Sequence, residues 1–597
     1  MPNLLAISFE GSLAPSFDLR CLHRGASKLP DGWGLGYYPG GEPSASVLKE
    51  PSPASGSIRS ELVKAWDHLE SSVFVLHIRR ATWGAISDAN TQPFVRTFAG
   101  RDYLFGHSGS LKDRLSLPSE TSPAFEPVGS TDTELVLCHL LSKLANEKRR
   151  SLSEIDPDTL LTFFDDLAEH GGMTSVLTDG RTLVVYADKK RDGALHLAHV
   201  VPPYERVVIG DSDLGVDLFR RGTKTRKGVL VSSEPLDPEP GVKLAWEAIE
   251  PGRLLVICEG AIVAAAGPRA DTGKKSVPPG QKVTRVMPRP RVAPPRRLEI
   301  VHRTAYRYDK PVERSSHLYR LAPIHDRLQS VVMHSLSVSV PAKSTDYDDV
   351  FGNLARRVEI DTPYTELAIE ARSVVDLLDT DPLSFRPLHK RWTIPLVWMP
   401  WQRHMLQPYL LPEELPDSQL EELSEYAMSF VERNGYDLFD SLLDMNATIY
   451  REYTYKPGTT TIHTSPFEVY EKRRGVCQDF ANLFICLARL LSVPARYACG
   501  YVYTHRNHEN TRQSEATHAW VQVYLPEVGW KGFDPTNGVM TQTDHVRVAV
   551  GRNYVDATPT SGTIWLGGGR ETLEVDVRCD VIPGPGEAAI EGTSARQ

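Results

Sequence analysis

The sequence predicts an α+β protein made of several domains. Its 597 residues exceed several times the roughly 100–200 residues of a typical domain. Short segments of alternating apolar and polar residues, typical of strands, are interspersed with segments whose apolar residues recur at three- and four-residue steps, typical of helices. Both patterns stop at 266–297, where proline and basic residues indicate a linker. We therefore expect independent domains on the two sides of this stretch.

Charge and cysteine content argue against several classes of protein. The formal net charge of -9 does not suit a nucleic-acid-binding surface, which needs a strongly basic domain. The 7 cysteines are sparse and odd in number, so a disulfide framework is not expected. No apolar segment approaches the roughly 18 residues of a membrane span, and the first residues lack the pattern of a secretory signal. We expect a cytoplasmic protein without nucleic-acid or membrane partners.

The first predicted domain, 1–265, mixes strands and helices. Its helix candidates carry apolar residues on one face, as helices that pack on sheets do. The strand candidates are 4–9, 72–78, 103–105, 182–186 and 253–258, and the helix candidates are 60–69, 133–146 and 157–170.

Six motifs in this domain resemble the class II glutamine amidotransferases. The resemblance implies an N-terminal nucleophile fold, with two stacked sheets between helices in a four-layer αββα arrangement. The nucleophile of that family is a cysteine directly after the initiator methionine, but this position is Pro2, which has no nucleophilic side chain. We therefore expect no glutaminase activity from this domain. The motifs are LLAIS (4–8), DGWG (31–34), HIRRATWG (77–84), NTQPF (90–94), GHSG (106–109) and STDTE (130–134).

The same resemblance implies a degenerate substrate pocket. Ser108, next to Gly109, occupies the position of the family's oxyanion-stabilising asparagine, and a hydroxyl is a poorer donor there. Arg79 and Asp132 match positions that hold the carboxylate and the amino group of glutamine. Glutamine or a glutamyl peptide is thus the implied ligand, and peptide-ligase enzymes are implied partners. The alternative is that Arg79 and Asp132 only form structural ion pairs.

After the linker the sequence predicts a β-rich region at 298–385, because 298–308 and 336–340 alternate apolar and polar residues. A domain at 386–582 follows, and the end of the chain, 583–597, has the composition of a frayed tail. Residues 395–412 are rich in Trp, Pro, Leu and Met, and they either brace neighbouring parts or line an approach to Cys477, with bracing favoured. Helices are predicted at 417–433 and 438–451, and late strands at 543–550 and 571–577.

The segment 465–534 contains the residue types of a thiol nucleophile. Cys477 begins a helix that Pro494 ends, and the positive end of a helix dipole favours a thiolate. His518 begins an alternating strand at 517–525, and the chain turns back to end at Asp534. The sequence does not determine the strand register. In one of the two parities His518 and Asp534 share a face, and the carboxylate can then orient the imidazole.

Several motifs of this segment resemble the bacterial transglutaminase-like superfamily, and 298–385 resembles the β-rich region that accompanies it. The resemblance implies a papain-like catalytic core with a triad of Cys477, His518 and Asp534. Each residue also has a structural interpretation, as a core cysteine, a strand-end histidine and a turn aspartate. The motifs are GVCQDFA (475–481), PARY (494–497), GY (500–501), THAW (517–520) and FDPT (533–536).

The predicted chemistry is attack of Cys477 on a peptide or protein amide to form a thioester. Water as acceptor makes the protein a hydrolase, which is favoured, and an amine makes it a transglutaminase. The non-enzymatic alternative is a scaffold that binds glutamyl peptides. No phosphate loop or dinucleotide motif is present, so no cofactor is expected. His505 and His508 lack neighbouring ligands at metal-site spacing, so no metal is expected either.

Overall fold

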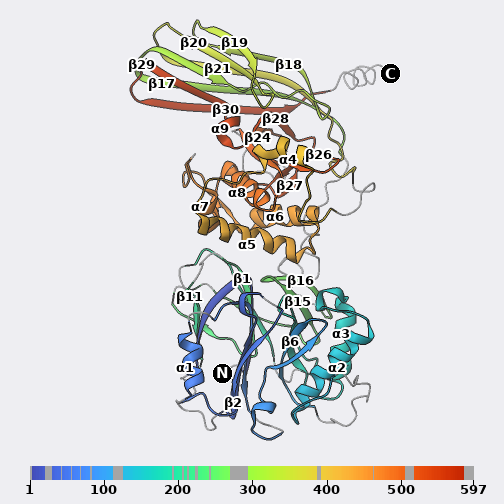
Figure 1. Ribbon diagram of the computed structural model, residues 1–597. Helices are drawn as coiled ribbons and strands as arrows, with labels where there is room; N and C mark the ends of the chain where they lie inside the picture. The colour runs from blue at the N-terminus through green and yellow to red at the C-terminus, as the bar shows by residue number, and fades with distance from the viewer. Residues whose placement is uncertain are drawn as a thin grey trace, which may run out of the picture. The chain divides into compact units, whose positions relative to one another are not determined.

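The computed structural model forms two compact units, Met1–Val283 and Thr284–Gln597, which are described separately (Figure 1). Pro2, His505 and His508, with most of the predicted linker and tail, lie outside the described residues. The structure describes residues 3–19, 30–41, 43–55, 57–66, 69–80, 84–111, 125–190, 194–204, 207–211, 214–221, 226–240, 242, 244–268, 293–385, 392–461, 463–503 and 517–583.

The first unit contains a ten-stranded and a six-stranded sheet. In the ten-stranded sheet the long strand β1 (Leu4–Asp18) pairs with β4, β11 and β12. The other strands of this sheet are β2 (Gly32–Tyr37), β3 (Ser46–Glu50), β4 (Ser71–Arg79), β9 (His196–Val200), β10 (Val208–Gly210), β11 (Gly215–Arg221), β12 (Gly228–Ser232), β13 (Asp237–Pro238) and β14 (Trp246–Ala248). The six-stranded sheet has the order β16 (Ala261–Ala266), β15 (Leu254–Cys258), β8 (Thr182–Tyr186), β7 (Thr174–Thr178), β6 (Arg101–Ser108) and β5 (Phe94–Phe98).

The alternation of apolar side chains along β1 produces the layers of this unit. Leu4 and Ala6 point into the core between the two sheets, whereas Leu5 and Ile7 point to the opposite face, where helix α1 (Ile58–Ala65) packs. The outer face of the six-stranded sheet is covered by α2 (Asp132–Asn146) and α3 (Pro157–Ala168). The predicted four-layer αββα fold is thereby confirmed.

The second unit begins with a β-rich part built on β17 (Arg296–Tyr319). This 24-residue strand pairs with β21 and β30 along its first half and with β20 and β29 along its second half. The predicted late strand at 571–577 is present in β30, and it returns to this sheet from the far end of the chain. The sheet also contains β18 (Gln329–Val338), β19 (Lys343–Asp348), β20 (Leu354–Ile360), β21 (Tyr364–Leu377), β29 (Thr560–Gly567) and β30 (Glu571–Val581).

The other part of this unit is a core of helices on a five-stranded sheet. The predicted helices at 417–433 and 438–451 are α5 (Asp417–Arg433) and α6 (Leu438–Glu452). Helix α8 packs on β24 and β25, the central strands of the sheet. The remaining elements are α7 (Pro466–Lys472), α8 (Cys477–Leu490), α9 (Tyr554–Ala557), the pair β22 (Thr454–Tyr455) and β23 (Arg474–Gly475), and the sheet strands β27 (Val539–Met540), β26 (Gly529–Asp534), β25 (His518–Leu525), β24 (Ala495–Val502) and β28 (His545–Gly551).

Side chains of the β-rich part complete the free edge of β28. Strand β28 is the last strand of its sheet, so one row of its backbone groups has no partner strand. The buried amide of Gln329 donates to the carbonyl of Arg547 at 2.8 Å and accepts from its N–H at 2.8 Å. The buried amide of Asn353 makes the same pair of bonds with Val550, at 2.7 and 2.8 Å. These amides fix the position of β28.

The tryptophan-rich segment braces the core through two of its aromatic side chains. Trp398 donates its indole N–H to the carbonyl of Ser492 at 3.1 Å, and Tyr409 packs edge-on against Trp530. Other apolar side chains of the segment, including Trp401 on helix α4 (Pro400–Leu406), are exposed. No helix of the described part of the chain has an apolar stretch long enough to cross a membrane.

Candidate functional site

Cys477 lies at the first position of α8, as the sequence predicts, and only 8% of its surface is exposed. Asp479 closes the start of the helix, because its Oδ2 accepts the N–H of Val476 at 2.8 Å and the hydroxyl of Thr460 at 2.6 Å. Gly475 is needed before the helix, since a Cβ there would lie 2.8 Å from the Cβ of Asp479. The thiol therefore sits at the positive end of the helix dipole.

The register of β25 and β26 resolves the parity that the sequence left open. Val521 lies opposite Phe533, so the next pair along the strands places Asp534 on the face that carries Trp520 and His518. The Nε2 atom of His518 is 2.8 Å from Oδ2 of Asp534. Both residues are buried, with 2% and 0% of their surface exposed.

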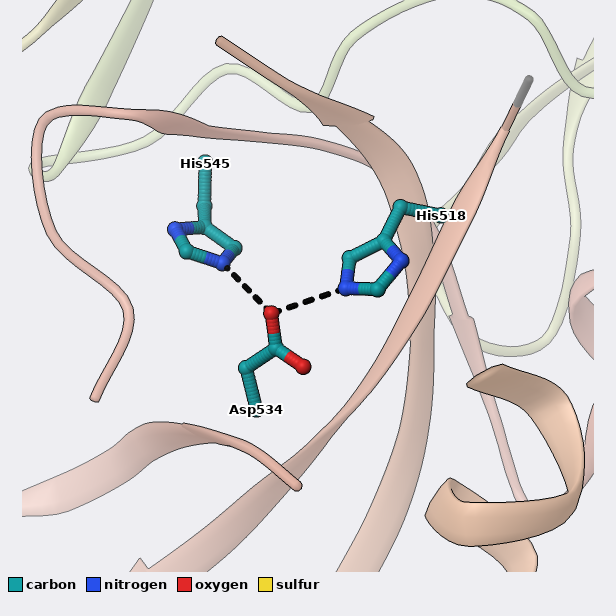
Figure 2. A group of neighbouring side chains, drawn as sticks. All are labelled: His518, Asp534 and His545. Carbon is teal, nitrogen blue, oxygen red and sulfur yellow. Dashed lines mark hydrogen bonds and ion pairs between the residues drawn. The ribbon is translucent and has the colours of Figure 1, made fainter. Parts of the chain in front are cut away.

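Asp534 accepts hydrogen bonds from five donors. Figure 2 shows its carboxylate between the imidazoles of His518 and His545. Burial by itself raises the pKa of this carboxyl, but the charges and hydrogen bonds of the two histidines outweigh it and hold the pKa far below its usual range. The donors to Oδ2 are His518 Nε2 (2.8 Å), Asn537 Nδ2 (2.7 Å) and His545 Nε2 (3.2 Å), and the donors to Oδ1 are the backbone N–H groups of Thr536 (3.0 Å) and Asn537 (3.2 Å).

His518 connects Asp534 to Cys477. Burial by itself lowers the pKa of His518, but the charge and hydrogen bond of Asp534, together with a hydrogen bond and charge from Cys477, raise it to about 10. Since Nε2 binds the carboxylate, Nδ1 is the ring nitrogen left for the thiol. The structure thus brings the three sequence-predicted residues together in the order thiol, imidazole, carboxylate.

Three further residues of this site were not predicted from the sequence. Asn537 follows Asp534 within three residues, and its side chain binds the same carboxylate. His545 binds Asp534 from β28, and its Nδ1 lies 2.6 Å from Oδ1 of Asp544. In the sequence, the only sign of Asp544 and His545 is an aspartate followed by a histidine at the start of a predicted strand. Such neighbours are too common to indicate a functional site.

Among the described residues, His518, Asp534 and His545 form the one group whose ligand types and spacing could suit a metal ion. In the structure the Nε2 atoms of His518 and His545 instead hydrogen-bond one oxygen of the Asp534 carboxylate, at 2.8 and 3.2 Å.

In the first unit, the residues predicted for a glutamine pocket lie at the ends of three elements. Arg79 ends β4 and donates to the carbonyl of Ala85 at 3.1 Å. Ser108 ends β6, and its hydroxyl accepts from Nδ2 of Asn3 at 2.8 Å.

The other two residues also contact backbone groups. Gly109 approaches Gly172 so closely that a Cβ would lie 2.3 Å from its carbonyl oxygen. Asp132 begins α2, and its carboxylate accepts the N–H groups of Leu111 at 2.8 Å and Thr133 at 3.0 Å. Structural contacts therefore use part of the hydrogen-bonding capacity of Arg79, Ser108 and Asp132.

Models of three protein families match successive parts of the chain. The model described as class-II glutamine amidotransferases matches residues 1–279. The bacterial transglutaminase-like N-terminal region matches 298–376, and the transglutaminase-like superfamily matches 426–535, a range that includes Cys477, His518 and Asp534.

The three relatives described next match between 44% and 49% of the chain. An uncharacterized protein of Mycobacterium tuberculosis is 32% identical over 309 residues, which are 49% of this chain and 94% of that protein. The protein YafJ of Escherichia coli is 29% identical over 264 residues, which are 44% of this chain and 94% of that protein. A crystal structure of a Cytophaga hutchinsonii protein is 23% identical, with a TM-score of 0.39, over 49% of this chain and 92% of that chain.

Replacement of Asp534 by asparagine is expected to lower the pKa of His518 from about 10, because the carboxylate charge that raises it is lost while burial still lowers it. Titration of 13C-labelled histidines by NMR measures this change.

The raised pKa of His518 stabilises the folded state fully below pH 6.5, and this contribution is lost as the pH rises through about 10. Asp534→Asn should therefore also remove this alkaline loss of stability. Unchanged titration of His518 would contradict the assignment.

Proposed function

Since the chain belongs to the transglutaminase-like superfamily through its C-terminal half and to the class II glutamine amidotransferases through its N-terminal half, we propose that it is a cysteine-dependent enzyme that cleaves amide or peptide bonds. Cys477 is the nucleophile, His518 transfers the proton and Asp534 orients His518. The single observation that carries this proposal is the buried hydrogen bond between His518 Nε2 and Asp534, which leaves Nδ1 for the thiol at the start of α8.

The proposed reaction has two halves joined by a thioester. The thiolate of Cys477 attacks the carbonyl carbon of the amide, and the imidazolium of His518 donates its proton to the departing amine, so that the C–N bond breaks and a thioester remains. His518 then removes a proton from water, which attacks the thioester; the C–S bond breaks, the acid is released, and the thiolate of Cys477 and the imidazolium of His518 are restored. Asp534 stays anionic throughout and stabilises the imidazolium.

The contacts of this site support an enzyme over a non-catalytic scaffold. A buried carboxylate that only ends a strand needs no ionisable partner, yet Asp534 binds His518 in addition to its backbone donors. Burial raises the pKa of Cys486 and of Cys499 to about 12, and neither has a histidine among the causes of its shift, whereas Cys477 is among the causes of the shift of His518.

We propose water as the acceptor of the acyl group, with an amine as the alternative. The two acceptors give different products from the same thioester, an acid or a new amide. An assay of a peptide substrate with and without an added primary amine, read by mass spectrometry, distinguishes them. A new amide as the main product would make the protein a transglutaminase.

For the first unit we propose binding of glutamine or a glutamyl peptide without glutaminase activity. Position 2 is proline, and Ser108 stands where the family has its oxyanion-stabilising asparagine. Arg79, at the end of β4, is the residue that we propose to bind the carboxylate of the ligand. This unit could then hold a glutamyl substrate or a peptide-ligase partner for the enzyme.

Cys477→Ala is expected to abolish amide cleavage without unfolding the chain, and His518→Ala to lower kcat by about 10³-fold or more, because each removes a participant in bond breaking. Asp534→Asn should lower kcat less than either of these, since the base remains but loses its orientation. Rates are measured on peptide and γ-glutamyl amides. Cys486→Ala, on the same helix, is the matched control and should keep the wild-type rate. Wild-type rates in all three variants would leave the scaffold as the better interpretation.

The full chain is expected to release no ammonia from glutamine through its first unit. It should bind glutamine or a γ-glutamyl peptide in a calorimetric titration, and Arg79→Ala should abolish this heat because it removes the carboxylate partner. Arg101→Ala, which removes an arginine from β6 that pairs with Asp179, is the control and should bind as the wild type does. A flat titration of the wild-type chain with both ligands would contradict the pocket.

A further inference from the structure

His545 contacts the candidate site from a separate strand. It lies on β28, whereas Asp534 ends β26 and His518 begins β25. Its Nε2 donates to Oδ2 of Asp534 at 3.2 Å, the oxygen that also binds His518, so two imidazoles approach one carboxylate oxygen from different strands (Figure 2). Trp520 packs edge-on against the ring of His545, with centroids 5.3 Å apart, and restricts its orientation.

Both ring nitrogens of His545 face carboxylates. Nδ1 lies 2.6 Å from Asp544 and Nε2 lies 3.2 Å from Asp534, so the ring satisfies both partners only when both nitrogens carry a proton. Burial by itself lowers the pKa of His545, but Asp544 and Asp534 raise it to about 9. Among the described residues, the charged or titratable groups that face His545, Asp544 or the adjoining cavity are Asp534, His518, Asp544, Arg296, Asp379, Arg547 and Cys579.

The strand that carries His545 is fixed by the β-rich part of the unit. Gln329 binds β28 at Arg547, two residues from His545, and the Arg547 guanidinium pairs with Asp326 at 2.7 Å. A cavity of about 20 Å³, enough for one water molecule, lies between these parts and is lined by His545 and Gln542. His545 thus stands between the candidate triad and the β-rich part.

We propose that His545 is a positioning residue, which with Asp544 extends the triad to a row of thiol, imidazole, carboxylate, imidazole and carboxylate. The proposal deepens the proposed function and rests on it. His545 donates to Asp534 from the side opposite to His518, holds the carboxylate in one rotamer and compensates its charge. His518 then keeps the orientation in which its other nitrogen meets Cys477. The β-rich part contributes to catalysis by holding β28 in place.

The test compares substitutions of two buried histidines of the same unit. His545→Ala removes the donor to Asp534, and His545→Gln keeps an amide N–H that can donate to it. His302→Gln is the matched control, because His302 is similarly buried and, among the described residues, its ring nitrogens bind the hydroxyls of Tyr501 and Thr304 and no carboxylate; burial lowers its pKa to about 4. Asp544→Asn removes the charge that faces Nδ1 of His545. This variant is less prone to misfold than His545→Ala, because the Asp544 side chain is 18% exposed.

Two readouts are measured for each variant: kcat and KM for amide cleavage, and the pH dependence of iodoacetamide labelling of Cys477, which needs no substrate. His545→Ala should lower kcat about 10- to 100-fold with KM within about twofold, since misplacement of a catalytic group costs about this much. Its labelling profile should move to higher pH, because the thiolate loses the support of an oriented imidazolium. His545→Gln should be intermediate, Asp544→Asn should change both readouts in the same direction but less, and His302→Gln should match the wild type.

Several results would overturn the proposal. These are wild-type kcat and labelling in His545→Ala, a change in KM alone, or equal losses in His545→Gln and His302→Gln, which would indicate a merely structural role. If His545→Ala does not fold, the kcat and labelling profiles of His545→Gln and Asp544→Asn, compared with those of His302→Gln, test the proposal instead. Absence of amide cleavage in the wild type would count against the proposed function only, because the labelling profiles still test His545 separately.

Discussion

The buried carboxylate of Asp534 is the constraint on which the site depends. A buried carboxylate stays ionised only when hydrogen-bond donors replace water at both of its oxygens. Five donors do so for Asp534, and they come from β25, β28 and the turn after β26. Loss of alignment among these strands would leave the charge unsatisfied. The fold and the site therefore stabilise each other, and the imidazole that faces Cys477 inherits its orientation from this arrangement.

The architecture of the second unit follows from the same requirement. Helix α8 packs on β24 and β25 and thereby places Cys477 against the sheet, while strand β26 returns so that Asp534 lies near the start of β25. Strand β28 would have a free edge beside this site, and the amides of Gln329 and Asn353 occupy it. The β-rich part is thus coupled to the candidate site through side-chain bonds to one strand, although it supplies none of Cys477, His518 and Asp534.

Much of this arrangement could be predicted from the sequence because it is local. The helix start at Cys477, the helices α5 and α6 and the strand at His518 all follow from periodicity and end signals, and their positions are confirmed. The parity of His518 and Asp534 could not be predicted, because it depends on how the turn between the strands closes. The contacts of His545 and the return of β30 to β17 join residues distant in sequence, and no local pattern encodes them.

The central claim is that Cys477 is a thiolate nucleophile paired with His518. The most direct measurement is brief labelling of the folded wild-type chain with iodoacetamide at pH 6, followed by mapping of the first adduct. The arrangement predicts that Cys477 reacts well before Cys486 and Cys499, whose thiols burial keeps protonated, and that His518→Ala removes this preference. Equal labelling of the three cysteines, or a preference that persists in His518→Ala, would contradict the pairing.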